Sequence, residues 1–391
     1  DRFSYFTEKN NFARLGSNFR MDTNSGYGLS FSICSIDATT AYPIISMVEG
    51  GSPASNVALK RGDIILALNG VDMKIEVKCN TENCEPVDVN KFTTIRSTLL
   101  ESLNRNEMKI EIENANNEKS TYTIANSSYE IDPLLTDTIY KFSNKNVGYF
   151  AYSSFEQIEN NNTNQRKIDA VINKFGQANI KALIVDLRYN GGGYVDAATY
   201  MADKIINSNG NGKLMLTYVL NNYLNSQKNS NYSTFKDVYF DKRNNFELET
   251  VCFLVSENTA SASEMLINVL KPYMNVKVIA VGSKTYGKPV GFFPQEILNK
   301  ISLWVTSFKL ANAVGESDYW NGLPVDQKNV QDYIFADFGQ RDEKMIAAAL
   351  VYTGAIESPT LSAKRAKISL SNNLKMNMGE VTTVPFKGAL K

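Results

Sequence analysis

The sequence predicts a multidomain protein of mixed α/β (α+β) class. Its 391 residues suffice for two or three domains, and a composition of 43% hydrophobic and 11% aromatic residues can fill their cores. Residues 145–350 alternate between short apolar runs and longer segments with helical periodicity. Nearer the N-terminus, residues 26–31 precede a strand-like run, and a Gly-Ser-Pro turn follows at 51–53.

Charge and hydropathy exclude several functions. The 41 basic residues balance 41 acidic residues, so nothing electrostatic favours a nucleic acid or an anionic membrane surface. No apolar run approaches the roughly 20 residues that a transmembrane helix needs. The sequence begins with Asp rather than Met, so we expect that it starts inside a longer precursor, and a signal peptide or lipid anchor would lie upstream.

The chain contains no histidine, which limits the catalytic chemistry open to it. A Ser-His-Asp triad is impossible, and a nucleophilic serine would need a lysine with a lowered pKa as its base. The segments Thr-Ala-Ser-Ala-Ser-Glu at 259–264 and Thr-Tyr-Gly-Lys at 285–288 contain the candidate pair, Ser261 and Lys288.

Ser261 is expected at a turn between a strand and a helix. Residues 250–255 are typical of a buried strand, and residues 263–271 are typical of a helix stopped by Pro272. The backbone N–H of Ala262, at the positive end of that helix, would then point at a developing oxyanion. Serine is also an ordinary helix cap, so this segment alone leaves both readings open.

A glycine segment follows a second predicted strand. Residues 180–187 are apolar enough to be buried on both faces of a sheet, and Arg-Tyr-Asn-Gly-Gly-Gly follows at 188–193. Such glycines permit close approach of a ligand to backbone amides, although a tight turn would use them equally well. The pattern matches neither a dinucleotide-binding fingerprint nor a P-loop.

Together, residues 186–193, 259–264 and 285–288 resemble, in order, the motifs of the C-terminal processing peptidases, or tail-specific proteases, a family of PDZ-containing Ser/Lys peptidases. The resemblance implies a crotonase-like α/β catalytic domain with Ser261 as nucleophile and Lys288 as general base. It also implies that the amides of Ala262, Gly192 and the adjacent Gly193 line the oxyanion hole. The implied activity is that of a serine endopeptidase cleaving near C-termini, with no metal or organic cofactor.

The N-terminal third resembles a bacterial PDZ domain through residues 26–31, 51–54 and 59–70. By this resemblance the backbone amides of Tyr27, Gly28 and Leu29 hold the terminal carboxylate of a peptide that adds a strand to the sheet. Alternatively, the groove is closed, or the domain only packs against the catalytic domain.

The resemblance also divides the chain. We expect residues 1–25 to be the remnant of an N-terminal region, 26–127 the PDZ domain, 128–355 the catalytic domain and 356–391 an extension to which no role is assigned. The expected partners are proteins or peptides with free C-termini, and not nucleic acids or metals. A catalytically silent peptide-binding protein is the alternative, against which the presence of both Ser261 and Lys288 argues.

The carboxylate of Glu264 is the candidate third residue of the site. It follows Ser261 by three positions and so shares its helical face. We expect it to orient the ammonium group of Lys288, because Phe292 replaces the glutamine that some family members have four residues after the lysine; Glu264→Gln would then retain activity. Glu264 could instead be a first-turn acid favoured by the helix dipole. A pocket lined by Tyr286 and Phe292 would lower the pKa of Lys288.

Four cysteines bear on the cellular compartment. Cys79 and Cys84 bracket a polar insertion after the strand that ends at Gly70, and we predict a disulfide between them. A disulfide indicates an oxidising compartment, here the periplasm or cell envelope, where a lipoprotein is one possibility. Two cysteines without histidine cannot complete a zinc site. Cys34 and Cys252 are expected to be buried thiols.

The other elements of the larger domain are expected from periodicity. Residues 221–245 are polar and are predicted to form one long exposed loop. The predicted strands are 147–155, 213–219, 276–282 and 302–309, and the predicted helices are 164–175, 196–206 and 342–352.

Overall fold

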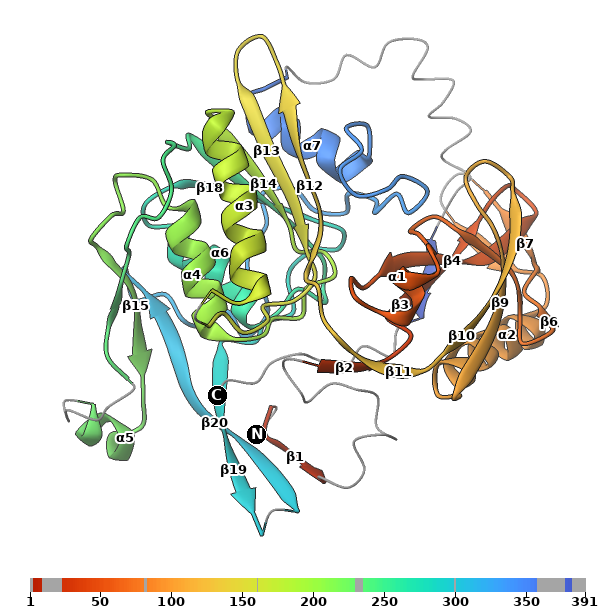
Figure 1. Ribbon diagram of the computed structural model, residues 1–391, viewed down its shortest axis with the longest axis horizontal. Helices are drawn as coiled ribbons and strands as arrows, with labels where there is room; N and C mark the ends of the chain where they lie inside the picture. The colour runs from red at the N-terminus through yellow and green to blue at the C-terminus, as the bar shows by residue number, and fades with distance from the viewer. Residues whose placement is uncertain are drawn as a thin grey trace.

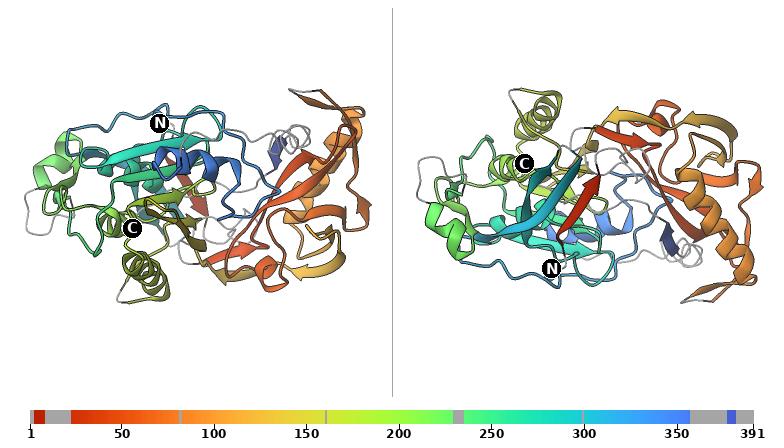
Figure 2. Two further views of the ribbon diagram at one scale, coloured as in Figure 1. Left: turned by 90° about the horizontal axis from the view of Figure 1, so that it is seen from above. Right: turned by 90° about the horizontal axis from the view of Figure 1, so that it is seen from below.

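The computed structural model describes residues 3–8, 23–80, 83–159, 161–228, 235–298, 300–356 and 377–381. These residues form two lobes joined by a narrower region (Figures 1 and 2). The larger lobe contains a sheet with helices on both faces, and the smaller lobe is mainly an antiparallel sheet.

The larger lobe is built on a five-stranded sheet. In spatial order its strands are β12 (Leu134–Lys141), β13 (Asn146–Tyr152), β14 (Ala182–Asp186), β17 (Thr250–Val255) and β18 (Asn275–Ala280). β12 is antiparallel to β13, and the remaining neighbours are parallel. All residues of β14 and β17 are buried, as expected of parallel strands covered on both faces.

Helices cover both faces of this sheet (Figure 1). They are α3 (Thr163–Gln177), α4 (Val195–Ile205) and α6 (Ala262–Leu270) on one face and α7 (Lys344–Tyr352) on the other. Alternation along β14 supplies both cores: Leu183 and Val185 pack under the first three helices, whereas Ile184 packs toward α7. The helical periodicity of the sequence is confirmed, since α3 buries Ile168, Val171, Ile172 and Phe175 at its i, i+3, i+4 and i+7 positions.

A second, antiparallel sheet lies beside the first in the larger lobe. Its strands are β1 (Tyr5–Glu8), β15 (Leu214–Val219), β16 (Val238–Tyr239), β19 (Val290–Ile297) and β20 (Ile301–Asn312). β1 pairs with β20, so residues near the start of the chain join this lobe.

The prediction of one exposed loop over residues 221–245 is wrong in two places. The side chain of Asn221 accepts the Leu224 N–H at 2.9 Å and caps the short helix α5 (Asn222–Gln227). β16 pairs with β15. Residues 229–234 of this segment lie outside the described residues.

The smaller lobe is an antiparallel sheet with two helices, α1 (Pro53–Asn56) and α2 (Val89–Leu103). Along the main path its strands are β10 (Lys119–Ala125), β9 (Glu107–Glu113), β5 (Ile64–Leu68), β4 (Thr40–Val48), β3 (Leu29–Ser35) and β21 (Asn377–Val381). The shorter strands β6 (Val71–Asp72), β7 (Ile75–Cys79) and β8 (Cys84–Pro86) extend it, and β2 (Thr23–Gly26) pairs separately with β11 (Ser127–Glu130). Ile95 and Leu99 of α2 pack into the same core as Phe31 of β3.

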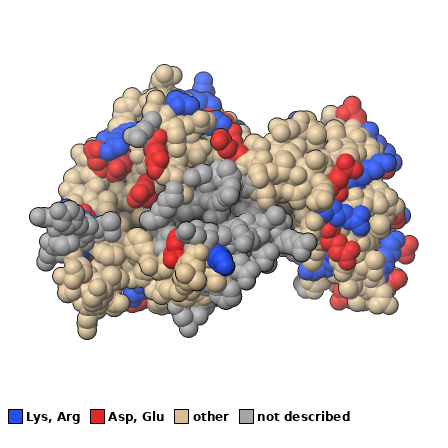
Figure 3. Space-filling model, turned by 60° about the horizontal axis from the view of Figure 1, so that its bottom comes forward, with Lys and Arg blue, Asp and Glu red and all other residues tan. Residues whose placement is uncertain are grey.

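On the face drawn in Figure 3, positively and negatively charged side chains do not form separate patches. Basic and acidic side chains lie next to one another on both lobes. Within the described ranges, no helix has the length and apolar character needed to cross a membrane.

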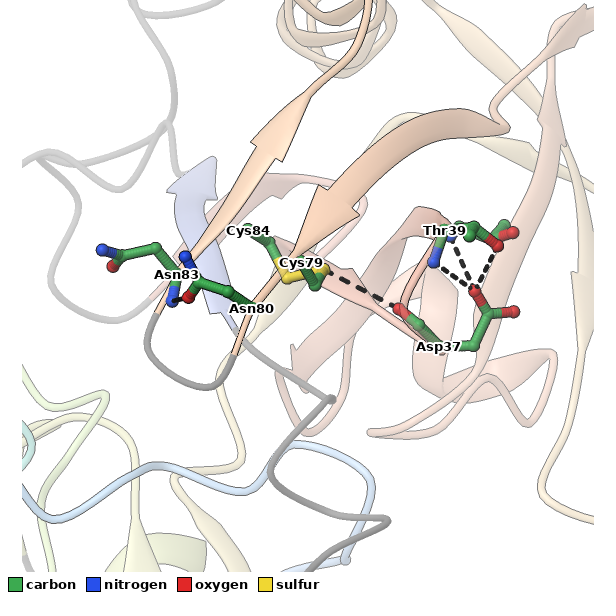
Figure 4. Close-up of a disulfide and its surroundings, with 7 residues drawn as sticks. Asp37, Thr39, Cys79, Asn80, Asn83 and Cys84 are labelled. Atoms are coloured by element: carbon green, nitrogen blue, oxygen red, sulfur yellow. Dashed lines mark hydrogen bonds between the residues drawn. A yellow bond between two sulfur atoms is a disulfide. The ribbon is translucent and has the colours of Figure 1, made fainter.

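A disulfide joins Cys79 and Cys84, which confirms the sequence prediction (Figure 4). The two cysteines face each other across the β7–β8 pair and so close this small hairpin. Cys34 and Cys252 are buried thiols, and burial raises the pKa of each to about 12.

Counting thiols checks this arrangement. Because Cys34 and Cys252 are buried and protonated, native protein should not react with iodoacetamide. Unfolding without a reductant should expose two alkylation sites, and unfolding with a reductant should expose four, as measured by intact mass. Four alkylated cysteines without a reductant would contradict the disulfide.

Candidate active site

The site is assembled at one edge of the five-stranded sheet. β13, β14 and β17 are parallel neighbours, so their carboxyl ends lie side by side. The glycine segment 188–193 follows β14, and the segment that leads to Ser261 follows β17. The carboxyl ends of parallel strands are where α/β sheets place their ligand sites.

Ser261 immediately precedes α6 and has φ 57° and ψ −117°. A non-glycine residue held in this region of backbone space costs about 1–3 kcal/mol, and such residues cluster at functional sites. Ser261 is half-buried, whereas the buried Ser263 donates its hydroxyl to the carbonyl and side-chain oxygens of Asn190 at 3.2 and 2.9 Å. The Ser263 hydroxyl thus holds the glycine segment, whereas Ser261 is the more exposed of the two serines.

The carboxylate of Glu264 holds the two turns of the site together. Oε2 accepts the backbone N–H groups of Ser261 and Lys288, at 3.0 and 2.8 Å. Oε1 accepts the Gly287 N–H at 2.8 Å and the hydroxyl of Thr285. Burial raises the pKa of this carboxyl group, and the four hydrogen bonds oppose that shift. Glu264 therefore acts on Lys288 through the backbone N–H, a contact that the sequence did not predict.

Lys288 is almost fully buried, at 2% exposure. Its Nζ lies 4.3 Å from the ring centroid of Phe292, and Tyr286 packs against the same small core as Phe292. Burial lowers the pKa of Lys288 to about 7, while the negative charge of Glu264 raises it. Burial is the larger effect, so a large fraction of the amine is neutral near neutral pH.

The turn that carries Lys288 requires a glycine at position 287. Gly287 has φ 90°, and a Cβ there would lie 2.5 Å from the N atom of Gly322 and from the carbonyl oxygen of Trp320. The neighbouring Leu323 N–H donates to the Thr285 hydroxyl at 2.7 Å. Residues 320–323 therefore pack directly against the lysine turn and fix its position.

In the glycine segment, one of the predicted oxyanion-hole donors, the Gly192 N–H, already makes a hydrogen bond within the protein. The Gly192 N–H donates to Oδ1 of Asn190 at 2.9 Å. The Gly192 carbonyl accepts the Phe155 N–H at 3.0 Å, so the Gly193 N–H, on the opposite side of the same planar peptide, points away from Phe155. Ala262 is the first residue of α6, where N–H groups have no intrahelical acceptor. Of the three predicted donors, only Ala262 lines the cavity that contains Ser261; Gly192 and Gly193 do not.

Ser261 and Lys288 line the same cavity, whose empty volume of about 250 Å³ includes space open to solvent. The other lining side chains are mostly apolar: Val195, Ala262, Met265, Val290, Leu310 and Tyr319. Apolar walls with a few convergent polar groups are typical of small-molecule and peptide-side-chain sites. In the part of the chain that the structure describes, no group of three or more His, Cys, Asp or Glu residues could hold a metal ion.

A buried ion cluster behind the glycine segment was missed by the sequence analysis. We define the inter-lobe ion cluster as Arg61, Asp186, Arg188, Asp332 and Glu343. Arg188, at 1% side-chain exposure, contacts Asp186 at 2.6 Å, Asp332 at 2.5 Å and Glu343 at 3.2 Å. Asp332 also pairs with Arg61 of the smaller lobe, and the two arginines hold its pKa down at about 2 against its burial. Asp186 and Arg188 stood in the glycine motif, but no local pattern could reveal partners more than 100 residues away.

Tyr27 and Gly28 directly precede β3 in the smaller lobe, and Leu29 is its first residue; none of the three lines the cavity that contains Ser261 and Lys288. The carbonyls of Tyr27 and Gly28 accept the N–H groups of Ala54 and Glu49, at 3.1 and 2.8 Å. The N–H groups of Gly28 and Leu29 lie on the opposite sides of these planar peptides and therefore point away from those partners. The Tyr27 side chain is buried and donates to the Arg105 carbonyl at 2.6 Å, so only its backbone is available to a ligand.

Part of the chain matches a known protein family. Residues 146–327 match the model of peptidase family S41. A probable CtpA-like serine protease of Staphylococcus aureus (strain N315) is 27% identical over 276 residues, which are 71% of this chain and 48% of that protein. A probable CtpA-like serine protease of Staphylococcus haemolyticus is 28% identical over 183 residues, or 47% and 33% of the two chains. The chain thus spans about half the length, or less, of the curated relatives it matches.

The fold is shared with a solved structure. A putative S41 protease from Bacteroides fragilis NCTC 9343 superposes with a TM-score of 0.66 and 22% identity, over 91% of this chain and 87% of that one. This likeness shows a common fold. Residues 146–327, just under half of the chain, therefore resemble peptidase family S41, and the curated relatives that match are named as CtpA-like serine proteases.

Replacing Glu264 tests its role as a positioning residue. Each carboxylate oxygen accepts two donors, so Glu264→Gln would turn an amide NH₂ toward at least one backbone N–H. We therefore expect Glu264→Gln, as well as Glu264→Ala, to lose at least about tenfold in kcat, or ~1.4 kcal/mol. This reverses the expectation that the sequence alone gave for glutamine.

Glu257→Gln is the matched control, because Glu257 is exposed on the same β17–α6 connection. The acid limb of the kcat profile should also move to lower pH in Glu264→Gln, since the charge that raises the pKa of Lys288 is gone. Full activity with an unchanged pH profile would show that Glu264 is only a helix-capping residue.

Proposed function

We propose that the protein is a serine endopeptidase with Ser261 as nucleophile and Lys288 as general base, which cleaves proteins or peptides near their C-termini. The observation that carries this proposal is the cavity that Ser261 and Lys288 line together, in a chain without histidine. The lowered pKa of Lys288 adds to it, because an ordinary lysine is protonated at neutral pH and cannot accept a proton.

The proposed mechanism is acyl transfer. Neutral Lys288 takes the hydroxyl proton as Ser261 Oγ attacks the substrate carbonyl, and the resulting ammonium returns a proton to the leaving amine. The amides of Ala262 and of Gly193 or Gly192 stabilise the oxyanion, with each donor worth about 3 kcal/mol. Use of Gly192 would require its N–H to leave Asn190. Water then hydrolyses the acyl-enzyme, with Lys288 again as base.

We also infer that residues 26–127 are a PDZ domain and residues 128–355 a crotonase-like catalytic domain. The antiparallel sheet with α1 and α2 supports the first assignment, and the helix-covered sheet β12-β13-β14-β17-β18 supports the second. In the PDZ domain the N–H groups of Gly28 and Leu29 would receive the carboxylate of a substrate, whose last residues would pair with β3. Gly28 has φ 71°, and a Cβ there would lie 2.1 Å from Cβ of Ser52, so this loop needs glycine.

The Cys79–Cys84 disulfide supports an exported protein in the periplasm or cell envelope, with a lipid anchor upstream as one form of attachment. A catalytically silent peptide-binding protein has less support. Such a protein would have no need of a strained Ser261 or of a buried Lys288, both of which cost stability.

Single substitutions at the two proposed catalytic residues test the function. Ser261→Ala and Lys288→Ala should each lose at least about 1,000-fold in cleavage of unfolded casein, measured by mass spectrometry, and the double variant should be no worse than either. Ser283→Ala and Lys284→Ala are matched controls, because both side chains are exposed in the segment that leads to Lys288. Circular dichroism would confirm folding. Retention of most activity by Lys288→Ala would end the Ser/Lys proposal.

The pH dependence follows from the pKa of Lys288. Only the neutral amine accepts the Ser261 proton, so kcat should rise with pH through about 7 and then level off. An unperturbed lysine would instead give a rise near pH 10. A profile that is flat between pH 5 and 9 would contradict Lys288 as the base.

A further inference from the structure

The chain supplies its own strand to the sheet edge where the proposed PDZ domain would receive a peptide. β21 pairs with β3 in antiparallel orientation, with Val381 opposite Phe31, Gly379 opposite Ile33 and Asn377 opposite Cys34. In Figures 1 and 2 it is the short blue strand beside the red strands of the smaller lobe. β21 also contacts α2, so it lies against both the edge strand and the helix of this lobe.

The direction of β21 is that of a captured peptide. Antiparallel pairing carries β21 from Cys34 toward Phe31, and the next residues of β3 in that direction lead to Leu29 and Gly28. A peptide whose carboxylate is held by the Gly28 and Leu29 amides must run along β3 in this same direction. The described strand and a substrate C-terminus would therefore require the same backbone groups of β3.

Without β21, the backbone groups on one edge of β3 would have no strand to pair with. β4 pairs with one side of β3, and β21 supplies the pairing on the other. All seven residues of β3 are buried, including Phe31 and Ile33 at 0% exposure. A seven-residue strand with an open edge invites pairing with other chains, so occupancy by β21 also protects the protein from aggregation.

We propose that β21 is an internal ligand of the PDZ domain, which a substrate C-terminus must displace before it can bind. This inference rests on the PDZ role proposed above. The occupant is the same chain, because the 20 residues between 356 and 377 can span up to about 65 Å. Binding of substrate then depends on the fraction of molecules in which β21 is undocked: if β21 is docked nine-tenths of the time, the affinity for a peptide falls about tenfold.

Adjacent prolines test this competition in the full chain. Successive N–H groups of a strand point to opposite sides, so Glu380→Pro with Val381→Pro removes a hydrogen bond to β3 in either phase of the pairing. Glu380→Ala with Val381→Ala is the matched control, because it keeps every backbone N–H. The probe is a fluorescein-labelled decapeptide that ends in valine with a free carboxylate, and the same peptide as a C-terminal amide is its reference.

The proline variant should bind the free-carboxylate peptide about tenfold more tightly than the wild type and the alanine variant, by fluorescence anisotropy, and the amide should bind more weakly. Hydrogen exchange gives a second measurement on the wild type: the amides of residues 31–34 should be protected, and excess peptide should speed exchange at residues 377–381 while β3 stays protected. Equal affinity for wild-type and proline proteins, or rapid exchange of β3 in the wild type, would overturn the inference. Protection that is lost on dilution would also overturn it, because a second copy would then supply the strand.

Casein cleavage separates this inference from the catalytic proposal. If casein is cleaved with dependence on Ser261 but the peptide binds neither wild type nor the proline variant, the internal-ligand inference fails and the protease stands. If the peptide competes with β21 while casein is not cleaved, the internal ligand stands and the catalytic proposal fails.

Discussion

The geometry of the site depends on one buried carboxylate. Glu264 accepts the backbone N–H groups of Ser261 and Lys288, which belong to turns 27 residues apart in the chain. A carboxylate is the side chain suited to this task, because its two oxygens can accept several donors at once. The negative charge of Glu264 raises the pKa of Lys288. The contacts that position Lys288 therefore also oppose the lowering of its pKa by burial. Burial of Lys288 beside Phe292 is the larger effect and lowers the pKa of the amine to about 7.

The site has an energetic cost, from backbone strain and from desolvation, that the stability of the surrounding fold must offset. Ser261 adopts a backbone conformation that few residues tolerate, and Lys288 is removed from water. Both groups are held where buried parallel strands end and α6 begins, with Ser263 and Asn190 tying that turn to the glycine segment. The rigid sheet and helix thus hold a strained Ser261 and a buried Lys288, both of which would relax in a flexible loop.

The inter-lobe ion cluster connects this site to the smaller lobe. Arg188 lies two residues before Asn190, whose side chain accepts the Gly192 N–H. Asp332 binds both Arg188 and Arg61, and Arg61 also donates to the Ser46 carbonyl at 2.7 Å within the smaller lobe. Removing one partner from such a cluster leaves a buried charge unpaired, which commonly costs about 3–5 kcal/mol. The relative position of the lobes and that of the glycine segment are therefore fixed by the same buried charges.

The sequence by itself determined several elements: strands near 182–186 and 250–255 and a helix that begins beside Ser261. In a chain without histidine it also led to Ser261 and Lys288 as the proposed reacting pair. These follow from local apolar periodicity and from side-chain chemistry. Only the tertiary structure decided which donors Glu264 accepts, that the Gly192 N–H is already bonded, and that Arg61 and Asp332 meet across the lobes. It also decided that residues 377–381 cover β3, because pairing between distant segments depends on backbone groups that every residue carries and that leave no trace in the sequence.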